Sequence, residues 1–396
     1  MVNSLQSYSV TQNEEEADAI VVNSCTVTNS ADVSVRGYIN QISRKNPNAK
    51  VYLSGCGTHT KGNSLFEKKS VFGVFGQSEK ESIEKWLTSD ERFYNPGDLE
   101  SLDSKLVEEF VGKSRAFIKI QEGCNFRCSY CIIPFVRGNA RSFDEERIVE
   151  QVAKLTANGF GEFILTGTNI GSFGEDKKTS LARLLKKLSQ IRGVRRIRLG
   201  SVEPIQISDE FKELLDEKWM SRHLHIALQH TSDTMLKIMN RRNRLKSDIE
   251  LFEYIASRGY ALGTDFIVGH PGESEVVWKE AMNNLRKFPL THIHSFTYSP
   301  REGTASSDMK ERINGNISKA RREELIEIID SNNQKFRAKN ASLPLEVLIE
   351  EKKDGFWTGY DQFFNRIMVK SREDLNGDWI NIEKYEVLEE FNYAQI

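Results

Sequence analysis

The chain has 396 residues, with 55 Lys and Arg side chains against 57 Asp and Glu, and 38% of its residues are apolar. This composition is typical of a globular protein and excludes a disordered, collagen-like or disulfide-scaffold chain. No apolar run approaches the roughly 18 residues that a membrane span needs. The first residues, MVNSLQSYSVTQNEEE, lack the basic start and apolar stretch of a signal peptide. We therefore expect a cytoplasmic protein, and at about 150 residues per domain it should have two to three domains.

The charge is unevenly distributed along the chain. Residues 1–110 carry 11 basic and 16 acidic side chains, residues 111–340 carry 38 and 29, and residues 341–396 carry 6 and 12. A basic middle between acidic ends indicates three units and a centre that faces a polyanion. A solvated surface explains the charge alone equally well, but the concentrated segments RGVRRIR (192–198) and RRNRLK (241–246) favour the polyanion.

The first unit, residues 1–110, is predicted to be a small α/β domain. Apolar and β-branched runs predict strands at 17–24, 50–55 and 71–76, and helical patterns lie between and after them, at 31–43 and 79–87. Alternation of strands and helices is typical of a parallel sheet.

The second unit, residues 111–340, repeats this alternation more regularly. Ser142 and Glu145 stand at the spacing of a capping box and predict the start of its first long helix. Six strand–helix steps are too few for a closed eight-fold barrel, so we expect an open, partial (βα)6 barrel or a doubly wound sheet. In either fold the site should lie at the carboxyl ends of the strands. The predicted strands are 116–121, 162–166, 195–201, 223–229, 263–269 and 292–299.

A long helix is predicted at about 318–340, and the third unit that follows it has a different sequence pattern. From Leu345 the chain reads as short strands broken by Asp-Gly and Asn-Gly turns. We expect residues 341–396 to form a small antiparallel β-barrel.

The chain has five cysteines, an odd number that argues against a disulfide framework. Cys124, Cys128 and Cys131 form a C-x3-C-x2-C pattern within GCNFRCSYCIIP, directly after the first strand of the basic unit. Three thiolates can hold a four-iron cluster and leave one iron open for another ligand. A zinc site would want a fourth Cys or His close by, and none stands there, so we favour an iron–sulfur cluster over zinc or chance.

At these residues the sequence resembles the radical S-adenosylmethionine (SAM) enzymes, in which C-x3-C-x-aromatic-C follows the first barrel strand. The resemblance implies that Cys124, Cys128 and Cys131 hold a [4Fe-4S] cluster whose open iron chelates SAM, and that Tyr130 lies near the adenine. One-electron reduction of bound SAM releases a 5′-deoxyadenosyl radical in that family. The protein itself would supply placement and a site that excludes water.

The block CSYCIIPFVRG (128–138) is similar to that of the methylthiotransferases, and this resemblance covers essentially the whole chain. It implies an N-terminal domain with an auxiliary [4Fe-4S] cluster, a radical SAM core and a C-terminal TRAM domain. NSCTVTNSAD with Cys25 and SGCGT with Cys56 match the auxiliary-cluster motifs.

Two further stretches, ILTGTNIGSFG (164–174) and RIRLGSVEP (196–204), look most like the enzymes that act on N6-threonylcarbamoyladenosine in tRNA. Those enzymes insert a methylthio group at C2 of the adenine beside the anticodon, using two SAM molecules. The resemblance implies tRNA as the substrate and a low-potential electron donor such as flavodoxin or ferredoxin. Isopentenyladenosine in tRNA and a ribosomal-protein aspartate remain alternative substrates.

The resemblance implies a cofactor pocket but no catalytic side chain beyond the cluster ligands. Gly167 and Thr168 are expected near the methionine end of SAM. Four further side chains at strand ends could face cofactor or substrate, namely Ser201, Glu203, Gln229 and Asp265.

Two features depart from the family pattern. The family uses three auxiliary cysteines and this chain has two, so we expect that the chain as written starts late. The C-terminal unit is acidic, so RNA binding there would need a local face that contains Lys370 and Arg372 with four aromatic residues, Phe356, Trp357, Tyr360 and Phe363.

The sequences HLH (223–225) and HIH (292–294) each place two histidines on one strand face. Such pairs can bind metal on barrel strands. Because no Asp or Lys stands near either pair in the sequence, we expect packed or surface histidines rather than a site.

Overall fold

The structure is a computed structural model that describes residues 5, 7–102 and 113–396. These residues divide into two compact units. The first, called here the N-terminal unit, contains the described residues up to 102 together with Glu122–Arg141 and Ser299–Asp308. The second, called the barrel unit, contains residues 113–121, Ser142–Tyr298 and Met309–Ile396. The C-x3-C-x2-C loop therefore belongs to the N-terminal unit, and the C-terminal strands belong to the barrel unit.

The N-terminal unit is built on a parallel sheet of order β1-β2-β3-β4, as the strand–helix alternation predicts. A short fourth strand at Phe93–Asn95 extends the three that the sequence indicates. Helix α1 packs Ile39 and Ile42 against Val51 and Leu53 of β2. The elements are β1 (Ala19–Ser24), α1 (Asn29–Lys45), β2 (Lys50–Gly55), α2 (Gly62–Glu67), β3 (Gly73–Phe75), α3 (Ile83–Leu87), β4 and, after the cysteine loop, α4 (Ile133–Arg137).

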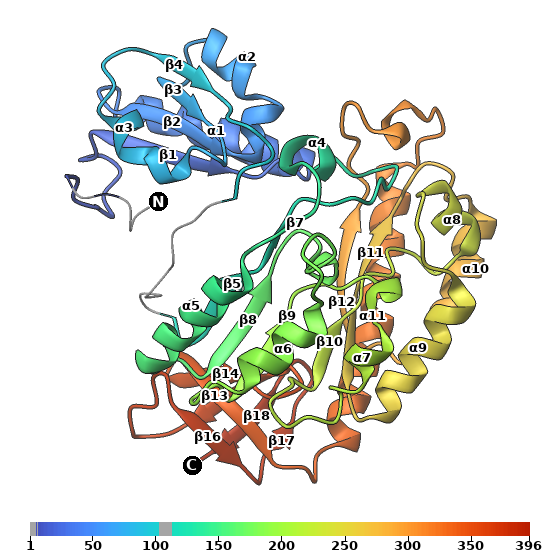
Figure 1. The fold of residues 1–396 in the computed structure, drawn as a ribbon. Helices are drawn as coiled ribbons and strands as arrows, with labels where there is room; N and C mark the ends of the chain where they lie inside the picture. The colour runs from blue at the N-terminus through green and yellow to red at the C-terminus, as the bar shows by residue number, and fades with distance from the viewer. Residues whose placement is uncertain (1–4, 6, 103–112) are drawn as a thin grey trace. The chain divides into compact units, whose positions relative to one another are not determined.

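The barrel unit contains a partial barrel of six parallel strands, which confirms the fold class. Two three-stranded sheets, β5-β8-β9 and β10-β11-β12, are joined by bridges from Ile197 to Met220 and from Val202 to Ile226. Figure 1 shows the strands side by side, with helices α6, α7 and α9 outside them. The strands are β5 (Ala116–Lys119), β8 (Glu162–Thr166), β9 (Arg196–Leu199), β10 (His223–His225), β11 (Ala261–Val268) and β12 (His292–Thr297).

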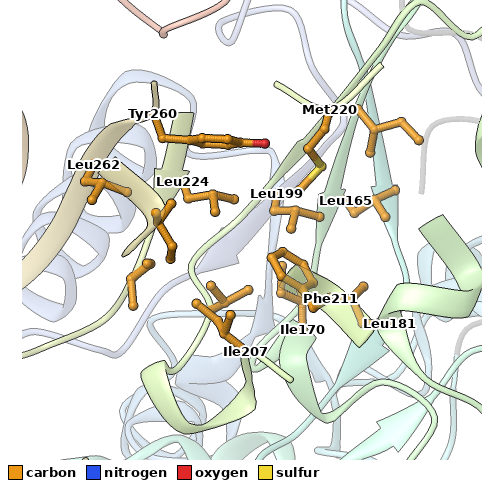
Figure 2. Packing of buried hydrophobic residues seen from close by; sticks show 14 of the residues in the cluster. Leu165, Ile170, Leu181, Leu199, Ile207, Phe211, Met220, Leu224, Tyr260 and Leu262 are labelled. Atoms are coloured by element: carbon orange, nitrogen blue, oxygen red, sulfur yellow. The ribbon is translucent and has the colours of Figure 1, made fainter. Parts of the chain in front are cut away.

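The helices of the barrel unit cover the outer face of the strands and bury its apolar core. Figure 2 shows part of this core, where Leu165 and Leu199 from the strands meet Phe211 of α7. The helices are α5 (Glu145–Ala157), α6 (Leu181–Ser189), α7 (Asp209–Lys212), α8 (Asp233–Ile238), α9 (Leu245–Ser257), α10 (Glu275–Leu285) and α11 (Gly315–Lys339). None of the helices among the described residues is long and apolar enough to cross a membrane.

The predicted capping box at the start of α5 is wrong in detail. Asp144, not Ser142, caps the helix by accepting a hydrogen bond from the Arg147 backbone N–H at 3.1 Å. Ser142 lies in the short strand β7 (Arg141–Ser142), and its backbone N–H donates to Asp176 at 3.0 Å. Ser142 therefore stabilises the loop after β8. Sequence spacing could not indicate this contact, because Asp176 is 34 residues away.

The C-terminal strands form one curled sheet of order β16-β13-β14-β15-β18-β17, a TRAM-like arrangement. All pairings are antiparallel except that of β15 with β18. Glu350 pairs with Arg115 just before β5, and Ala261, the first residue of β11, joins the core of this sheet. The sheet thus packs where the barrel strands begin. Its strands are β13 (Leu345–Lys353), β14 (Phe356–Tyr360), β15 (Arg366–Lys370), β16 (Trp379–Ile382), β17 (Glu386–Val387) and β18 (Asn392–Gln395).

Candidate functional site

The C-x3-C-x2-C loop begins after the short strand β6 (Gln121–Glu122) and is held by its own returning segment. The Cys124 backbone N–H donates to the Gly138 carbonyl at 3.0 Å, and the Cys131 N–H donates to the Cys128 carbonyl at 3.0 Å. Gly123 has φ +72°, and a Cβ there would lie 1.9 Å from the Asn139 carbonyl oxygen. Only glycine fits at this crossing, which places Cys124 directly after the turn.

All three cysteines of the loop are of intermediate burial, and Tyr130 is half-buried in the turn between the second and third. The Phe126 backbone N–H donates to the Cys124 sulfur at 3.4 Å, a contact that stabilises a thiolate. Three soft donors on one short, backbone-pinned loop suit a [4Fe-4S] cluster with one open iron. The loop therefore fits the cluster that its spacing predicts.

Cys25 and Cys56 follow neighbouring parallel strands at the same edge of the sheet. Ser24 of β1 pairs with Gly55 of β2, so the residue after each strand end is a cysteine. Cys25 is exposed and Cys56 is buried. A Cβ at Gly55 would lie 2.3 Å from the Ser24 carbonyl oxygen, which explains the glycine that precedes Cys56.

Arg137 lies between the buried Cys56 and a buried carboxylate. Its Nε is 2.9 Å from the Cys56 sulfur, and its Nη1 is 2.9 Å from Glu122 Oε1. Burial lowers the pKa of Arg137, but the charges of Glu122 and Cys56 outweigh this effect and leave that pKa raised. Arg137 therefore links the Cys56 sulfur to Glu122 and fixes a cation beside this cysteine. Two cysteines suit an auxiliary cluster only in part, because the family pattern has three.

The sequence interpretation missed Arg301. This residue lies in the segment Ser299–Asp308, which follows the last barrel strand in sequence and belongs to the N-terminal unit. The Arg301 side chain is 4% exposed. Its Nη2 donates to Asp32 and to Thr26, both at 2.7 Å, and its Nη1 donates to Asn29 at 2.8 Å. Three residues of the predicted motif NSCTVTNSAD thus hold an arginine rather than a cofactor. The polar residues Thr26, Asn29 and Asp32 after Cys25 are visible in the sequence. Their common partner, Arg301, could not be inferred because it is about 270 residues away.

Gly167 and Thr168 lie in the turn after β8, where Gln121 organises the backbone. The Gln121 side-chain oxygen accepts from the N–H groups of Thr168 at 3.1 Å and Asn169 at 2.8 Å. A Cβ on Gly167 would lie 2.8 Å from the Gln121 carbonyl oxygen. The turn thus has the tight geometry that a glycine allows, and Gln121 is a positioning residue that the sequence interpretation missed.

Glu203 and Gln229 have structural partners within the barrel unit. Both carboxylate oxygens of Glu203 pair with Arg241, whose side chain is only 4% exposed. Gln229 has φ +66°, and its backbone bridges to β11 through the Asp265 carbonyl at 2.9 Å. Glu203 therefore forms an ion pair and Gln229 a backbone hydrogen bond within the barrel unit. Their predicted contacts with the cofactor stay predictions.

Three of the eight basic side chains in the two predicted clusters, Arg196, Arg198 and Arg241, are buried. The other five are exposed, so the polyanion-facing surface stays a prediction that rests on those five. Arg196 and Arg198 of β9 are 2% and 4% exposed. Both donate to the buried carboxylate of Glu162 on β8, at 3.0 and 2.6 Å. Arg196 also reaches Glu346 of β13 at 3.0 Å. This network ties the start of the barrel to the C-terminal sheet, and Arg241 of the second cluster is taken by Glu203.

The proposed RNA face of the C-terminal sheet is wrong for two of its aromatic residues. Trp357 and Phe363 are 6% and 5% exposed and belong to the core of the sheet. The indole N–H of Trp357 donates to the Glu373 carbonyl at 2.9 Å. Tyr360 stacks on Phe364 with ring centroids 4.8 Å apart, and both rings face the cavity of the barrel unit.

A cavity of about 990 Å³ lies inside the barrel unit. Side chains of all six barrel strands, of α11 and of the C-terminal sheet line it. The expectation that no acid completes the histidine pairs is wrong, because Asp265 on the middle strand lies between them. Asp265 Oδ1 is 3.1 Å from His225 Nε2 and 3.6 Å from His294 Nδ1. Ser201 donates to Asp265 Oδ2 at 3.1 Å.

The ionisation of this cluster follows from its contacts. Burial raises the pKa of Asp265, but hydrogen bonds from His225, His294 and Ser201 outweigh it and hold that pKa well below its usual range. The hydrogen bond to Asp265 raises the pKa of His294. Burial lowers the pKa of His223 and brings that of His292 to about 4. The cavity therefore contains an ionised carboxylate, neutral histidines at its inner end and one histidine that favours the charged form.

The neutral His292 makes stability depend on pH. A buried base with a lowered pKa contributes stability that is present above its unfolded pKa of about 6.5 and is lost as the pH falls toward 4. We expect His292→Gln to remove on the order of 1–2 kcal/mol of the stability loss between pH 7 and pH 5. Urea unfolding of both proteins at the two pH values measures this difference, and an unchanged pH dependence in the variant contradicts it.

The cysteine loop and the strands that follow match a known family. Residues 118–285 match the radical SAM superfamily, and residues 1–76 match the uncharacterized protein family UPF0004. Among solved structures, the radical S-adenosylmethionine methyltransferase TsrM from Kitasatospora setae aligns with a TM-score of 0.56 and 16% identity. The alignment covers 73% of this chain and 65% of that chain and shows a shared fold alone. The partial barrel, the three-cysteine loop and the family match together identify this chain as a radical SAM protein.

Two curated relatives narrow this class. A putative methylthiotransferase of Helicobacter pylori J99 is 52% identical over 398 residues, which cover 100% of this chain and 95% of the relative. The threonylcarbamoyladenosine tRNA methylthiotransferase MtaB of Bacillus subtilis is 33% identical across 93% of this chain and 86% of that protein. The chain belongs to the radical SAM methylthiotransferases. Its cofactors are SAM and a [4Fe-4S] cluster, and its UPF0004 domain carries the auxiliary cluster.

Proposed function

We propose that this protein inserts a methylthio group at C2 of N6-threonylcarbamoyladenosine beside the anticodon of tRNA. The observation that carries the proposal is the 33% identity to the Bacillus subtilis enzyme, which extends over 93% of the chain. The cavity of about 990 Å³ has room for a modified nucleoside.

The residues of the chain have distinct roles in this proposal. Cys124, Cys128 and Cys131 hold the cluster that, with bound SAM and one electron, supplies the radical. Cys25 and Cys56 hold the auxiliary site, and Arg137 lies in hydrogen-bond contact with the Cys56 sulfur. Tyr130, Gly167 and Thr168 shape the SAM site, and the electron comes from a low-potential donor such as flavodoxin or ferredoxin. The domain limits that we propose are 1–110, 111–340 and 341–396.

The cavity suits a nucleobase better than a peptide carboxylate. Phe117 and Phe296 lie on its wall and are 42% and 46% exposed, so two aromatic rings are accessible from the cavity. Exposed aromatic rings of this kind can stack on an unstacked base of an RNA loop. A ribosomal-protein aspartate gives these rings no planar partner.

The test uses the purified chain reconstituted with iron, sulfide, SAM and a low-potential reductant. Three anticodon stem-loop RNAs are compared, with adenosine, isopentenyladenosine or threonylcarbamoyladenosine at the target position. We expect mass spectrometry to find the methylthio product with the third RNA only. Product with the isopentenyl RNA, and none with the threonylcarbamoyl RNA, overturns the proposal.

A further inference from the structure

The histidine–aspartate cluster of the cavity is built by three neighbouring strands. Asp265 of β11 stands opposite His294 of β12, and Gly263 of β11 stands opposite both His225 of β10 and His292 of β12. A Cβ on Gly263 would lie 2.8 Å from the ring of His225. Glycine at this position therefore leaves room for the imidazole that reaches Asp265.

Asp265 uses both of its oxygens inside the cluster. Oδ1 faces the two imidazoles, and Oδ2 accepts from Ser201. The side chains of His225 and Asp265 are 9% and 18% exposed, whereas that of His294 is 63% exposed. The His225 and His294 rings stack with centroids 4.6 Å apart. The cluster thus fixes His294 at the cavity wall and presents it to whatever fills the cavity.

The charged groups around His294 favour an anion in the cavity. Two other lining arginines are neutralised within the protein, since Arg198 pairs with Glu162 and Arg115 with Glu350. Arg322 of α11 lines the same cavity and donates to the carbonyl and hydroxyl of Ser295, the neighbour of His294. Arg366 also lines the cavity. The acidic side chains of the cavity lining, besides Asp265, are Asp330 and Glu390. Asp265 is already compensated by its partners, so the remaining cationic groups of the lining are His294 of β12, Arg322 of α11 and Arg366 of β15.

The same cavity has an apolar, aromatic wall. Phe117 of β5 and Phe296 of β12 are exposed and line it, and so does Ile164 of β8, the strand next to β5. Phe296 is two residues beyond His294 on the same face of β12. A ligand that satisfies both features is flat and aromatic and carries a negatively charged substituent.

We propose that His294, held by Asp265 and assisted by Arg322, binds the carboxylate of the threonylcarbamoyl substituent and so selects this nucleoside over neutral N6-substituted adenosines. This inference rests on the proposed function and adds the residues that read the substrate. A charge-assisted hydrogen bond in a partly dry cavity is strong enough to discriminate between an acid and a neutral isostere.

The experiment compares two stem-loop RNAs, one with threonylcarbamoyladenosine and one in which its carboxylate is the primary amide. For the reconstituted wild-type enzyme we expect kcat/KM to favour the acid by about 10–100-fold. His294→Gln should lower this ratio to about 1–3-fold, mainly through KM, because a binding contact is lost rather than a reacting group. His292→Gln is the matched control, since it removes a neutral imidazole from the same strand and should keep the preference for the acid.

A pH series separates recognition from mere packing. The raised pKa of His294 means that the charged form, and with it the preference for the acid, is lost as the pH rises through that pKa. The wild-type preference should therefore fall as the pH rises beyond the ordinary histidine pKa of about 6.5, and that of His294→Gln should not change. Affinity of the holoenzyme for the two RNAs, measured by fluorescence anisotropy, gives the same comparison without turnover.

The outcomes distinguish the two proposals. If the wild-type enzyme neither binds nor modifies the acid RNA in preference to unmodified adenosine RNA, the proposed function fails. If it modifies the acid and amide RNAs equally, the proposed function stands and the role of His294 is refuted. Loss of one equivalent of bound zinc or iron in His294→Gln, measured by elemental analysis, also refutes it, because the His225, Asp265 and His294 donors lie within 4.8 Å of one another and would then be metal ligands.

Discussion

Replacing Cys128 by alanine is expected to abolish both the methylthio product and the formation of 5′-deoxyadenosine from SAM. Cys128 is the middle donor of a loop that is pinned by backbone bonds at Cys124 and Cys131, so no other thiol on this loop can take its place. With two thiolates left, a four-iron cluster loses a ligand and its reactive, open-iron arrangement. The measurements are iron and sulfide content, 5′-deoxyadenosine by chromatography and methylthio product by mass spectrometry.

Cys56→Ala is the matched variant, because Cys56 belongs to the other pair of cysteines. It should lose the methylthio product and still form 5′-deoxyadenosine, since the C-x3-C-x2-C loop is intact. The side chain is buried among Ile132 and Val136, where alanine leaves only a small space. If Cys128→Ala keeps 5′-deoxyadenosine formation, or if Cys56→Ala alone loses it, the assignment of the two cysteine sets is wrong.

The second large effect concerns stability. We expect Glu162→Gln to lower the free energy of unfolding of the barrel unit by about 3–5 kcal/mol, because it leaves two buried arginines without their shared counter-charge. Glu162 is 1% exposed and contacts Arg196 at 3.0 Å and Arg198 at 2.6 Å. Urea unfolding followed by tryptophan fluorescence measures the change.

Arg195 provides the control for this prediction. It is the immediate neighbour of Arg196, but its side chain is 49% exposed and its pair with Glu346 spans 3.4 Å. Arg195→Gln should change the free energy of unfolding by less than about 1 kcal/mol, as for other surface pairs. Equal effects of the two substitutions would show that burial of the ion network does not determine its contribution.

The parts of the fold that depend on short-range pattern were predictable from the sequence. Strands such as 162–166 and helices such as α6 show their period directly, and the spacing of Cys124, Cys128 and Cys131 identifies a cluster loop within eight residues. These signals are local, because each is set by neighbours along one strand, helix or loop.

The parts that failed depend on partners that are distant in sequence. Arg196 and Arg198 read as part of a basic surface because Glu162, their shared buried partner, is more than 30 residues away on the neighbouring strand. The histidine pairs read as isolated because Asp265, which joins them, comes from a third strand. A charged residue in an otherwise apolar strand, such as Glu162 in EFILT, is the one sequence signal that could have indicated a buried pair.

The central claim, methylthiolation of threonylcarbamoyladenosine in tRNA, is tested most directly by nucleoside mass spectrometry of total tRNA from cells with and without this gene. We expect the methylthio form to disappear in the deletion strain, its threonylcarbamoyladenosine precursor to accumulate, and the methylthio form to return on expression of the wild-type gene but not of Cys128→Ala. An unchanged profile of threonylcarbamoyladenosine and its methylthio form in the deletion strain contradicts the account.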